Sequence, residues 1–179
     1  GQTFNLSSIS VADYLDSWID SYCKMNLKYN TQLGYLYTIE NHLKPSLGMY
    51  RLKSLTPSAV QEFVNALKLR GLSRASIVGI FSTLSAALDY AIEPLKYIQY
   101  NPCNNVRIPK DTAPKKETRY IITPEQFKQI IERFPEGSNF YIPLMIGYYT
   151  GVRISECFGL TWNDVDFDNQ TISISKALL

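Results

Sequence analysis

Apolar residues recur every three or four positions through roughly the first hundred residues, and this spacing predicts amphipathic helices. Four such apolar faces lie at residues 11–22, 33–43, 60–67 and 77–91, and the last is the longest and most regular. No run in this part alternates apolar and polar residues in the way that is typical of a strand. The pattern therefore predicts a four-helix domain over residues 1–102.

Short polar residues mark where the first two helices are expected to begin. Ser8 or Ser10 can cap the first helix, and Asn30 or Thr31 the second. Such side chains accept a hydrogen bond from the free amides of a first helical turn. Pro45 and Gly48 are expected to end the second helix, because proline lacks the amide hydrogen that a helix interior needs and glycine is common just past a helix end.

The third and fourth helices have clearer signals. Thr56-Pro57 is a cap followed by proline in the first turn, where no amide hydrogen is required, and Gly71 is expected to stop this helix. Ser73 is expected to cap the fourth helix. The Asn101-Pro102 pair is expected to close the domain.

The pattern changes after residue 102. Residues 103–119 are polar and contain prolines, a composition that is typical of an extended linker. Thr123 and Gln126 then have the spacing of a capping box, and apolar residues up to position 149 predict two further helices. Residues 165–167 and 171–174, on either side of a turn, predict a β-hairpin.

One short stretch, Thr150-Gly151-Val152-Arg153-Ile154-Ser155-Glu156, has a chemistry of its own. Gly151 permits a backbone turn that a side chain would hinder. Arg153 then falls near a helix N-terminus, where amides and the helix dipole favour an anion. Glu156 lies three residues further on, close enough to hold the arginine side chain.

Two interpretations of Arg153 are open on these residues alone. It can be a structural arginine whose main partner is Glu156. Alternatively, its planar fork of donors, which matches a phosphate, can stabilise the charge that develops while the phosphorus undergoes substitution.

The composition is that of an ordinary globular protein. Of 179 residues, 45% are hydrophobic, and no run approaches the roughly 20 apolar residues that span a membrane. The cysteines Cys23, Cys103 and Cys157 are odd in number and lack the spacing of a metal site. We therefore expect reduced thiols in a cytoplasmic protein.

The net charge of +2 is too small to indicate a nucleic-acid partner, but the distribution of charge says more. Basic residues are in excess in two zones, residues 44–74 and residues 107–119. Such zones can be no more than a solvated surface. They also suit a protein that grips a polyanion.

The arginine motif and the following Leu160-Thr161-Trp162-Asn163-Asp164-Val165-Asp166 together resemble the first catalytic box of the tyrosine recombinases, the phage and transposon integrases. Upstream, Gly71-Leu72-Ser73, Asn101-Pro102 and Val106-x-x-Pro109-Lys110 resemble that family's core-binding domain. The resemblance implies a mainly α protein. It would have a SAM-like core-binding domain at 1–102, a linker at 103–119, and the start of a catalytic domain with a β-hairpin at 120–179.

The resemblance also implies a function, site-specific DNA recombination or integration of a mobile element. In that family a tyrosine attacks the scissile phosphate and forms a 3′-phosphotyrosyl link, without a metal or another cofactor. Arg153 matches the first of the family's two catalytic arginines, and Glu156 matches the supporting acidic residue. The implied partner is double-stranded DNA, on which the full-length protein would form a tetramer, and no membrane is involved.

The expected DNA contacts lie at the starts of the second and fourth helices and in the linker. Amides, dipole and a basic side chain can meet a phosphate at a helix start. The candidates are Lys28, Thr31 and Gln32 for the second helix, Ser73, Arg74 and Ser76 for the fourth, and Lys115, Lys116 and Arg119 in the linker.

Other parts of the family's catalytic apparatus have no counterpart here. The second box, His-x-x-Arg, is absent, because the single histidine, His42, is followed by Leu43-Lys44-Pro45 and is expected to be an ordinary surface or helix residue. Lys176 comes too early to match the catalytic lysine well, and no tyrosine has the context of the nucleophile. We therefore expect the N-terminal part of an integrase, able to bind DNA but not to cut it.

Two other classes of function stay open at this point. A helical DNA-binding regulator or decoy would lack recombinase activity, but no short helix pair with a polar recognition helix supports it. A helical protein-interaction domain would leave the linker and the arginine box unexplained.

Overall fold

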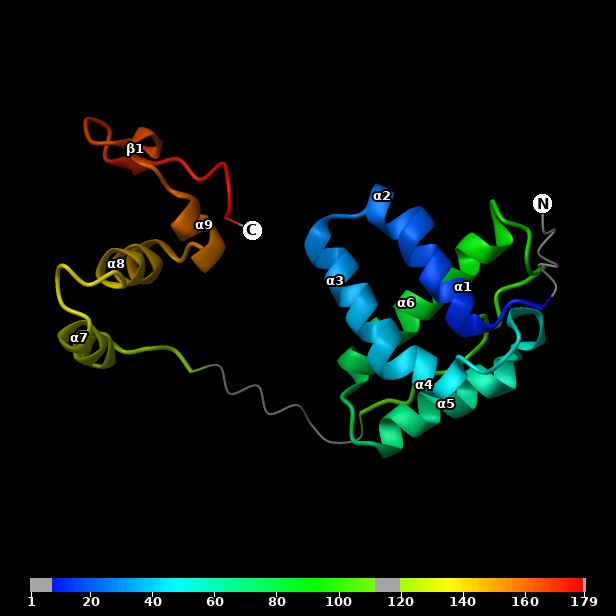
Figure 1. The fold of residues 1–179 in the computed structure, drawn as a ribbon. Helices are drawn as coiled ribbons and strands as arrows, with labels where there is room; N and C mark the ends of the chain where they lie inside the picture. The colour runs from blue at the N-terminus through cyan, green and yellow to red at the C-terminus, as the bar shows by residue number, and fades with distance from the viewer. Residues whose placement is uncertain (1–7, 112–119, 179) are drawn as a thin grey trace. The chain divides into compact units, whose positions relative to one another are not determined.

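The structure is a computed structural model that describes residues 8–111 and 120–178 (Figure 1). The chain divides into two compact units, residues 1–115 and 116–179, each of which is described by itself. Among the described residues helices dominate, and the strands form a single two-stranded sheet. The predicted mainly α fold with a hairpin is therefore confirmed.

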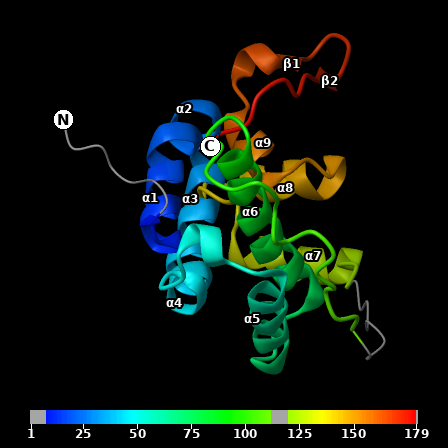
Figure 2. The ribbon, with the colours of Figure 1, turned by 90° about the vertical axis from the view of Figure 1, so that its right-hand side faces the viewer.

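The first unit is built from helical segments, and Figures 1 and 2 show their order in space. Their bounds are α1 Val11–Trp18, η2 Ile19–Cys23, α2 Lys24–Asn26, α3 Tyr29–Thr38, η3 Ile39–Leu43, α4 Lys44–Leu47, η4 Leu52–Ser54, α5 Pro57–Leu69 and α6 Arg74–Ile92. The segments η2 and η3 are π-helical turns, so that α1 to α2 and α3 to α4 are two continuous runs. These two runs with α5 and α6 are the four predicted helices.

Three of the four predicted helix starts are confirmed. The hydroxyls of Ser10, Thr56 and Ser73 accept hydrogen bonds from backbone amides of the first turns of α1, α5 and α6, at 3.0, 3.2 and 3.1 Å. The second start was placed too late. Helix α3 begins at Tyr29, directly after Lys28, so neither Asn30 nor Thr31 caps it.

The predicted end of the second helix is confirmed at Gly48, which is the C-cap residue of α4, but Pro45 does not stop the run. Pro45 lies inside the run, in the first turn of α4. The π turn η3 directly precedes it and has already interrupted the α-helical hydrogen-bond register, with the Lys44 amide donating to the Ile39 carbonyl. An amide hydrogen at Pro45 is therefore not needed, and the run continues to Leu47.

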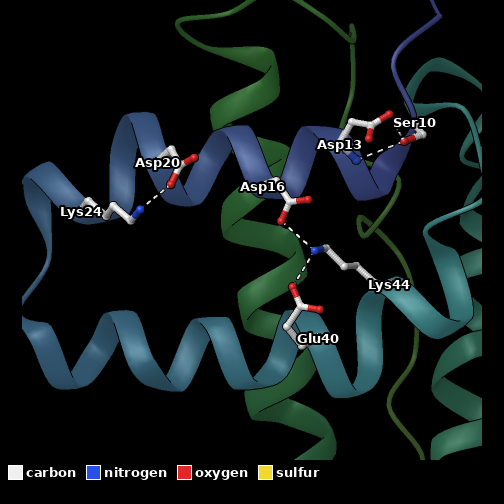
Figure 3. Close-up of polar contacts among 7 residues, drawn as sticks. All are labelled: Ser10, Asp13, Asp16, Asp20, Lys24, Glu40 and Lys44. Atoms are coloured by element: carbon white, nitrogen blue, oxygen red, sulfur yellow. Dashed lines mark hydrogen bonds and ion pairs between the residues drawn. The ribbon is translucent and has the colours of Figure 1, made fainter.

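Helix α6 passes across α1 and α3 and supplies much of the core (Figure 3). Its buried residues meet large side chains from α1, η3 and α5, among them Trp18, Leu43 and Leu67. By length and composition alone α6 could cross a membrane. Its apolar residues on one face are accounted for by burial in this core: Ile77, Ile80, Leu84, Ala87, Leu88 and Ala91.

Figure 3 shows how the two long runs are held together on their outer side. The Lys44 ammonium lies 2.7 Å from a carboxylate oxygen of Asp16 on α1 and also bonds to Glu40 on its own run. Hydrogen bonds to Asp16 and then Glu40 raise the pKa of Lys44 above its ordinary value. A second pair, Lys24 and Asp20, spans one helical turn and is more exposed.

The segment predicted to begin the linker packs on the first unit instead. Cys103 is buried in the core, and Val106 and Ile108 pack against it. Gln61 on α5 donates to the Arg107 carbonyl and accepts from the Arg107 amide, both at 2.8 Å. Because the segment 103–111 is polar overall, its composition did not predict that its apolar residues dock on the core. The remainder of the predicted linker, 112–119, lies outside the described residues.

The second unit holds α7 Pro124–Arg133, α8 Tyr141–Thr150, α9 Ile154–Gly159, η5 Trp162–Asp164, β1 Val165–Asp166 and β2 Thr171–Ile172. The capping box of α7 is confirmed, because Thr123 and Gln126 exchange side-chain and backbone hydrogen bonds. The antiparallel pairing of β1 with β2 confirms the hairpin, although both strands are shorter than predicted. The Asp166 carboxylate accepts the amide hydrogens of Asp168 and Asn169 and holds the turn.

Candidate functional site

The arginine motif lies between two helices of the second unit. Helix α8 ends at Thr150 and is capped by Gly151, whose φ of +70° is a left-handed conformation that glycine adopts without strain. Two residues later Arg153 precedes α9 as its N-cap residue, in an extended conformation. The predicted turn and the predicted helix start are therefore both present.

Glu156 holds Arg153 from the first turn of α9. Its carboxylate accepts the Arg153 backbone amide at 2.9 Å and a guanidinium N–H at 3.1 Å. These bonds, the backbone one first, lower the pKa of Glu156 below its ordinary range. The two bonds therefore favour the charged form of the Glu156 carboxylate.

The guanidinium of Arg153 is fixed on one side and open on the other. Its side chain is 83% exposed, against 24% for Glu156. An arginine has five N–H donors, and the contact with Glu156 uses one of them. The arrangement can therefore present several donors to an anion while the carboxylate sets the direction of the side chain.

Lys176 has a local partner in the structure. Its ammonium lies 2.9 Å from Asp164 and 3.2 Å from the Thr161 hydroxyl. The hydrogen bond from Lys176, followed by those from the Thr161 side chain and amide, lowers the pKa of Asp164 to about 2. This pair ties the segment after β2 to the turn before β1.

We expect replacement of Lys176 by methionine to raise the pKa of Asp164 toward its ordinary value of 3.8. A depressed carboxyl pKa contributes stability above pH 3.8 that is lost as the pH falls toward about 2. The Asp164 carboxyl carbon can be titrated by NMR in both proteins, with Lys128→Met on α7 as the control. An unchanged titration in Lys176→Met would show that Thr161 alone holds the carboxylate.

The start of α6 carries the second group of candidates. Ser73 uses its hydroxyl to accept the Ser76 amide at 3.1 Å, and the two hydroxyls lie 3.0 Å apart. Arg74 is the first residue of the helix and is exposed. An arginine in this position is free to meet a phosphate at the helix N-terminus.

A hollow of about 420 Å³ lies beside this helix start, between α6 and the continuous run from α3 to α4. It is lined by Tyr37, Thr38, His42, Leu72, Ser76, Gly79 and Ile80. Of the predicted residues, Ser76 is the one that lines it. Sequence reasoning missed Tyr37 and Thr38, although Thr38 and His42 are four residues apart and so share a helix face.

His42 lies in the helical segment η3, as one of the two predicted alternatives has it, and its side chain is partly buried. It lines the hollow, and its Nδ1 is buried without a hydrogen-bond partner in the described structure. Burial, and then the charge of Arg70, lower the pKa of His42. Both effects favour the neutral imidazole over the charged one.

The candidates at the start of α3 are arranged differently. Lys28 and Thr31 are exposed, and none of the three candidates there lines the hollow. The Gln32 amide donates to the Leu27 carbonyl at 2.7 Å and so holds the loop between α2 and α3. Lys115, Lys116 and Arg119 lie outside the described residues.

Comparison with protein families gives two matches. Residues 10–68 match the phage integrase N-terminal SAM-like domain, and residues 121–178 match the phage integrase family. A XerC-like tyrosine recombinase of Caldanaerobacter subterraneus subsp. tengcongensis is 24% identical over 99% of this chain and 46% of its own length. The ICEBs1 integrase of Bacillus subtilis is 28% identical over 95% and 45%. The chain thus spans about half the length of these curated relatives.

Solved structures show the same likeness. The Tn1549 transposon integrase in complex with circular intermediate DNA superposes with a TM-score of 0.72 and 30% identity, over 96% of this chain and 56% of that chain. A lambda integrase dimer bound to a core site has a TM-score of 0.71 at 22% identity, over 90% of this chain and 44% of that chain, and so shows a shared fold.

Proposed function

Because this chain belongs to the tyrosine recombinase family, the phage and transposon integrases, we propose that it serves site-specific DNA recombination by a mobile element. The observation that carries the proposal is the arginine motif. Arg153 follows a left-handed glycine, is fixed by Glu156 and leaves most of its donors open to solvent. A structural arginine would instead use its donors within the protein.

The first unit is proposed to bind duplex DNA. The start of α6 presents Arg74 beside the hollow that Ser76 lines, so that a basic side chain and the hydroxyls of Ser73 and Ser76 lie close together. Phosphate contacts from such groups set the position of a protein on the duplex. Lys28 and Thr31 on α3 would extend the contact, together with Lys115, Lys116 and Arg119.

The second unit is proposed to be the start of the catalytic domain, with residues 8–111 as the core-binding domain. In the reaction a tyrosine attacks the scissile phosphorus, its bond to the 5′ oxygen breaks, and the 5′ oxygen leaves with a proton. Arg153 would donate to a non-bridging oxygen and stabilise the charge of the pentacoordinate transition state. The active form would be a tetramer on DNA in the cytoplasm.

We expect Arg74→Ala to weaken binding to duplex DNA and to reduce the salt dependence of binding. Loss of one phosphate contact lowers the slope of log K against log salt by about one unit. Binding is measured by fluorescence anisotropy at several salt concentrations, with Lys53→Ala on η4 as the control. Equal slopes for Arg74→Ala and the unsubstituted protein would remove Arg74 from the interface.

A further inference from the structure

A second hollow in the first unit has a chemistry that does not suit DNA. It measures about 520 Å³ and lies where α1, η2, α3 and α6 meet. Its lining is mainly aromatic and acidic: Trp18, Tyr22, Leu27, Tyr35, Ala86, Asp89, Tyr90 and Glu93. We call it the aromatic–acidic pocket.

The aromatic rings of the pocket form one connected group. Trp18 stacks on Tyr35 with ring centroids 5.4 Å apart and on Tyr22 at 6.0 Å, and Tyr22 meets Tyr90 at 4.6 Å. The π turn η2 places Tyr22 in this group, and π turns are frequent at binding sites. Ring faces carry partial negative charge and attract cations.

Two carboxylates also line the pocket, one on α6 and one directly after the end of that helix. Asp89 and Glu93 are one helical turn apart and both are exposed. Asp89 accepts one hydrogen bond, from the Asn101 amide at 2.7 Å. In the described part of the chain Glu93 has no side-chain hydrogen bond or ion pair. The residues that line the pocket include no Lys or Arg, and neither carboxylate has an ion pair with a described residue, so the pocket has an excess of negative charge.

Trp18, which lines the pocket, also carries a buried polar atom. Trp18 is 1% exposed, and its buried Nε1–H has no acceptor among the described residues. A buried N–H without a partner costs free energy, and tryptophan normally finds one. A cationic ligand would satisfy the carboxylates and the ring faces together.

We propose that the aromatic–acidic pocket binds an arginine or lysine side chain presented by a peptide segment of a protein partner. The cation lies against the aromatic rings beside Glu93 and Asp89. A DNA phosphate would be repelled by the two carboxylates, so the pocket is a protein-docking site. The proposal does not depend on the DNA-binding role.

The test uses the fluorescence of Trp18. The chain has two tryptophans, so Trp162→Phe in the whole 179-residue protein leaves Trp18 as the single reporter. The protein is titrated with the blocked tripeptide glycyl-arginyl-glycine, with its lysine counterpart, and with the version that contains citrulline, the neutral shape match of arginine. We expect a saturable change in emission with both cationic peptides and a response at least several-fold weaker with citrulline.

Charge variants make the test specific. Glu93→Lys replaces attraction by repulsion at an exposed position, and we expect it to weaken binding of the cationic peptides by roughly tenfold. Glu62→Lys on α5 carries the same charge change away from the pocket and should bind as the Trp162→Phe parent does. An equal effect of the two variants would overturn the proposal, as would equal binding of the citrulline peptide. So would a saturable response of Trp18 to duplex DNA that the cationic peptide competes away.

Discussion

Replacing Arg153 by lysine in a cleavage-competent form of the protein should reduce strand cleavage by about 10²–10³-fold, or ~3–4 kcal/mol. Lysine keeps the positive charge but loses the planar fork, so it cannot contact a phosphate and Glu156 in the same geometry. Affinity for DNA should change far less, because many phosphate contacts share it. Cleavage of a nicked suicide substrate and binding to the same duplex are measured side by side.

Glu156→Gln is the matched comparison for this prediction. Glutamine keeps an oxygen that can accept the Arg153 amide but loses the charge that attracts the guanidinium. We therefore expect a milder loss of cleavage than for Arg153→Lys. Near-normal cleavage by Arg153→Lys would mean that Arg153 is only the structural partner of Glu156, and the proposed catalytic role would be wrong.

Leu84→Ala should destabilise the first unit by about 3–4 kcal/mol, within the range for a buried leucine. Leu84 lies in the middle of α6, is fully buried and belongs to the same core as Trp18. The substitution removes packed methyl groups and leaves a cavity that the surrounding helices fill only in part. Urea unfolding followed by Trp18 emission in the Trp162→Phe background measures the change.

Leu69→Ala is the control for this prediction. Leu69 ends α5 and is 90% exposed, so the same chemical change should alter the free energy of unfolding by less than about 0.5 kcal/mol. Similar effects at Leu84 and Leu69 would show that α6 does not pack in solution as it does in this structure.

The features that the sequence predicted correctly are local. The caps at Ser10, Thr56 and Ser73 and the contact of Arg153 with Glu156 each join residues three positions apart. Backbone geometry brings such residues together wherever a helix begins, so their identities and spacing are enough to predict the contact. The apolar periodicity predicted α6 correctly for the same reason, because residues three or four positions apart lie on the same face of a helix.

The wrong predictions arose where the surrounding structure overrides a local signal in the sequence. Pro45 is a strong local stop signal, but the π turn before it removes the need for its amide hydrogen. The composition of residues 103–111 predicts a polar linker, yet Cys103 is buried in the core and the Arg107 backbone forms hydrogen bonds with Gln61 on α5. Neither partner is visible from the composition of the segment itself.

The sequence by itself determined the family, the order of helices and the arginine motif, because these depend on residues within one or two helical turns of each other. The tertiary structure decided which side chains share a surface. It brought His42 and Ser76 to one hollow and Trp18, Tyr90 and Glu93 to another. The members of each hollow come from helices that are far apart in the chain. Their proximity follows from how the helices pack around α6, and no spacing in the sequence records that packing.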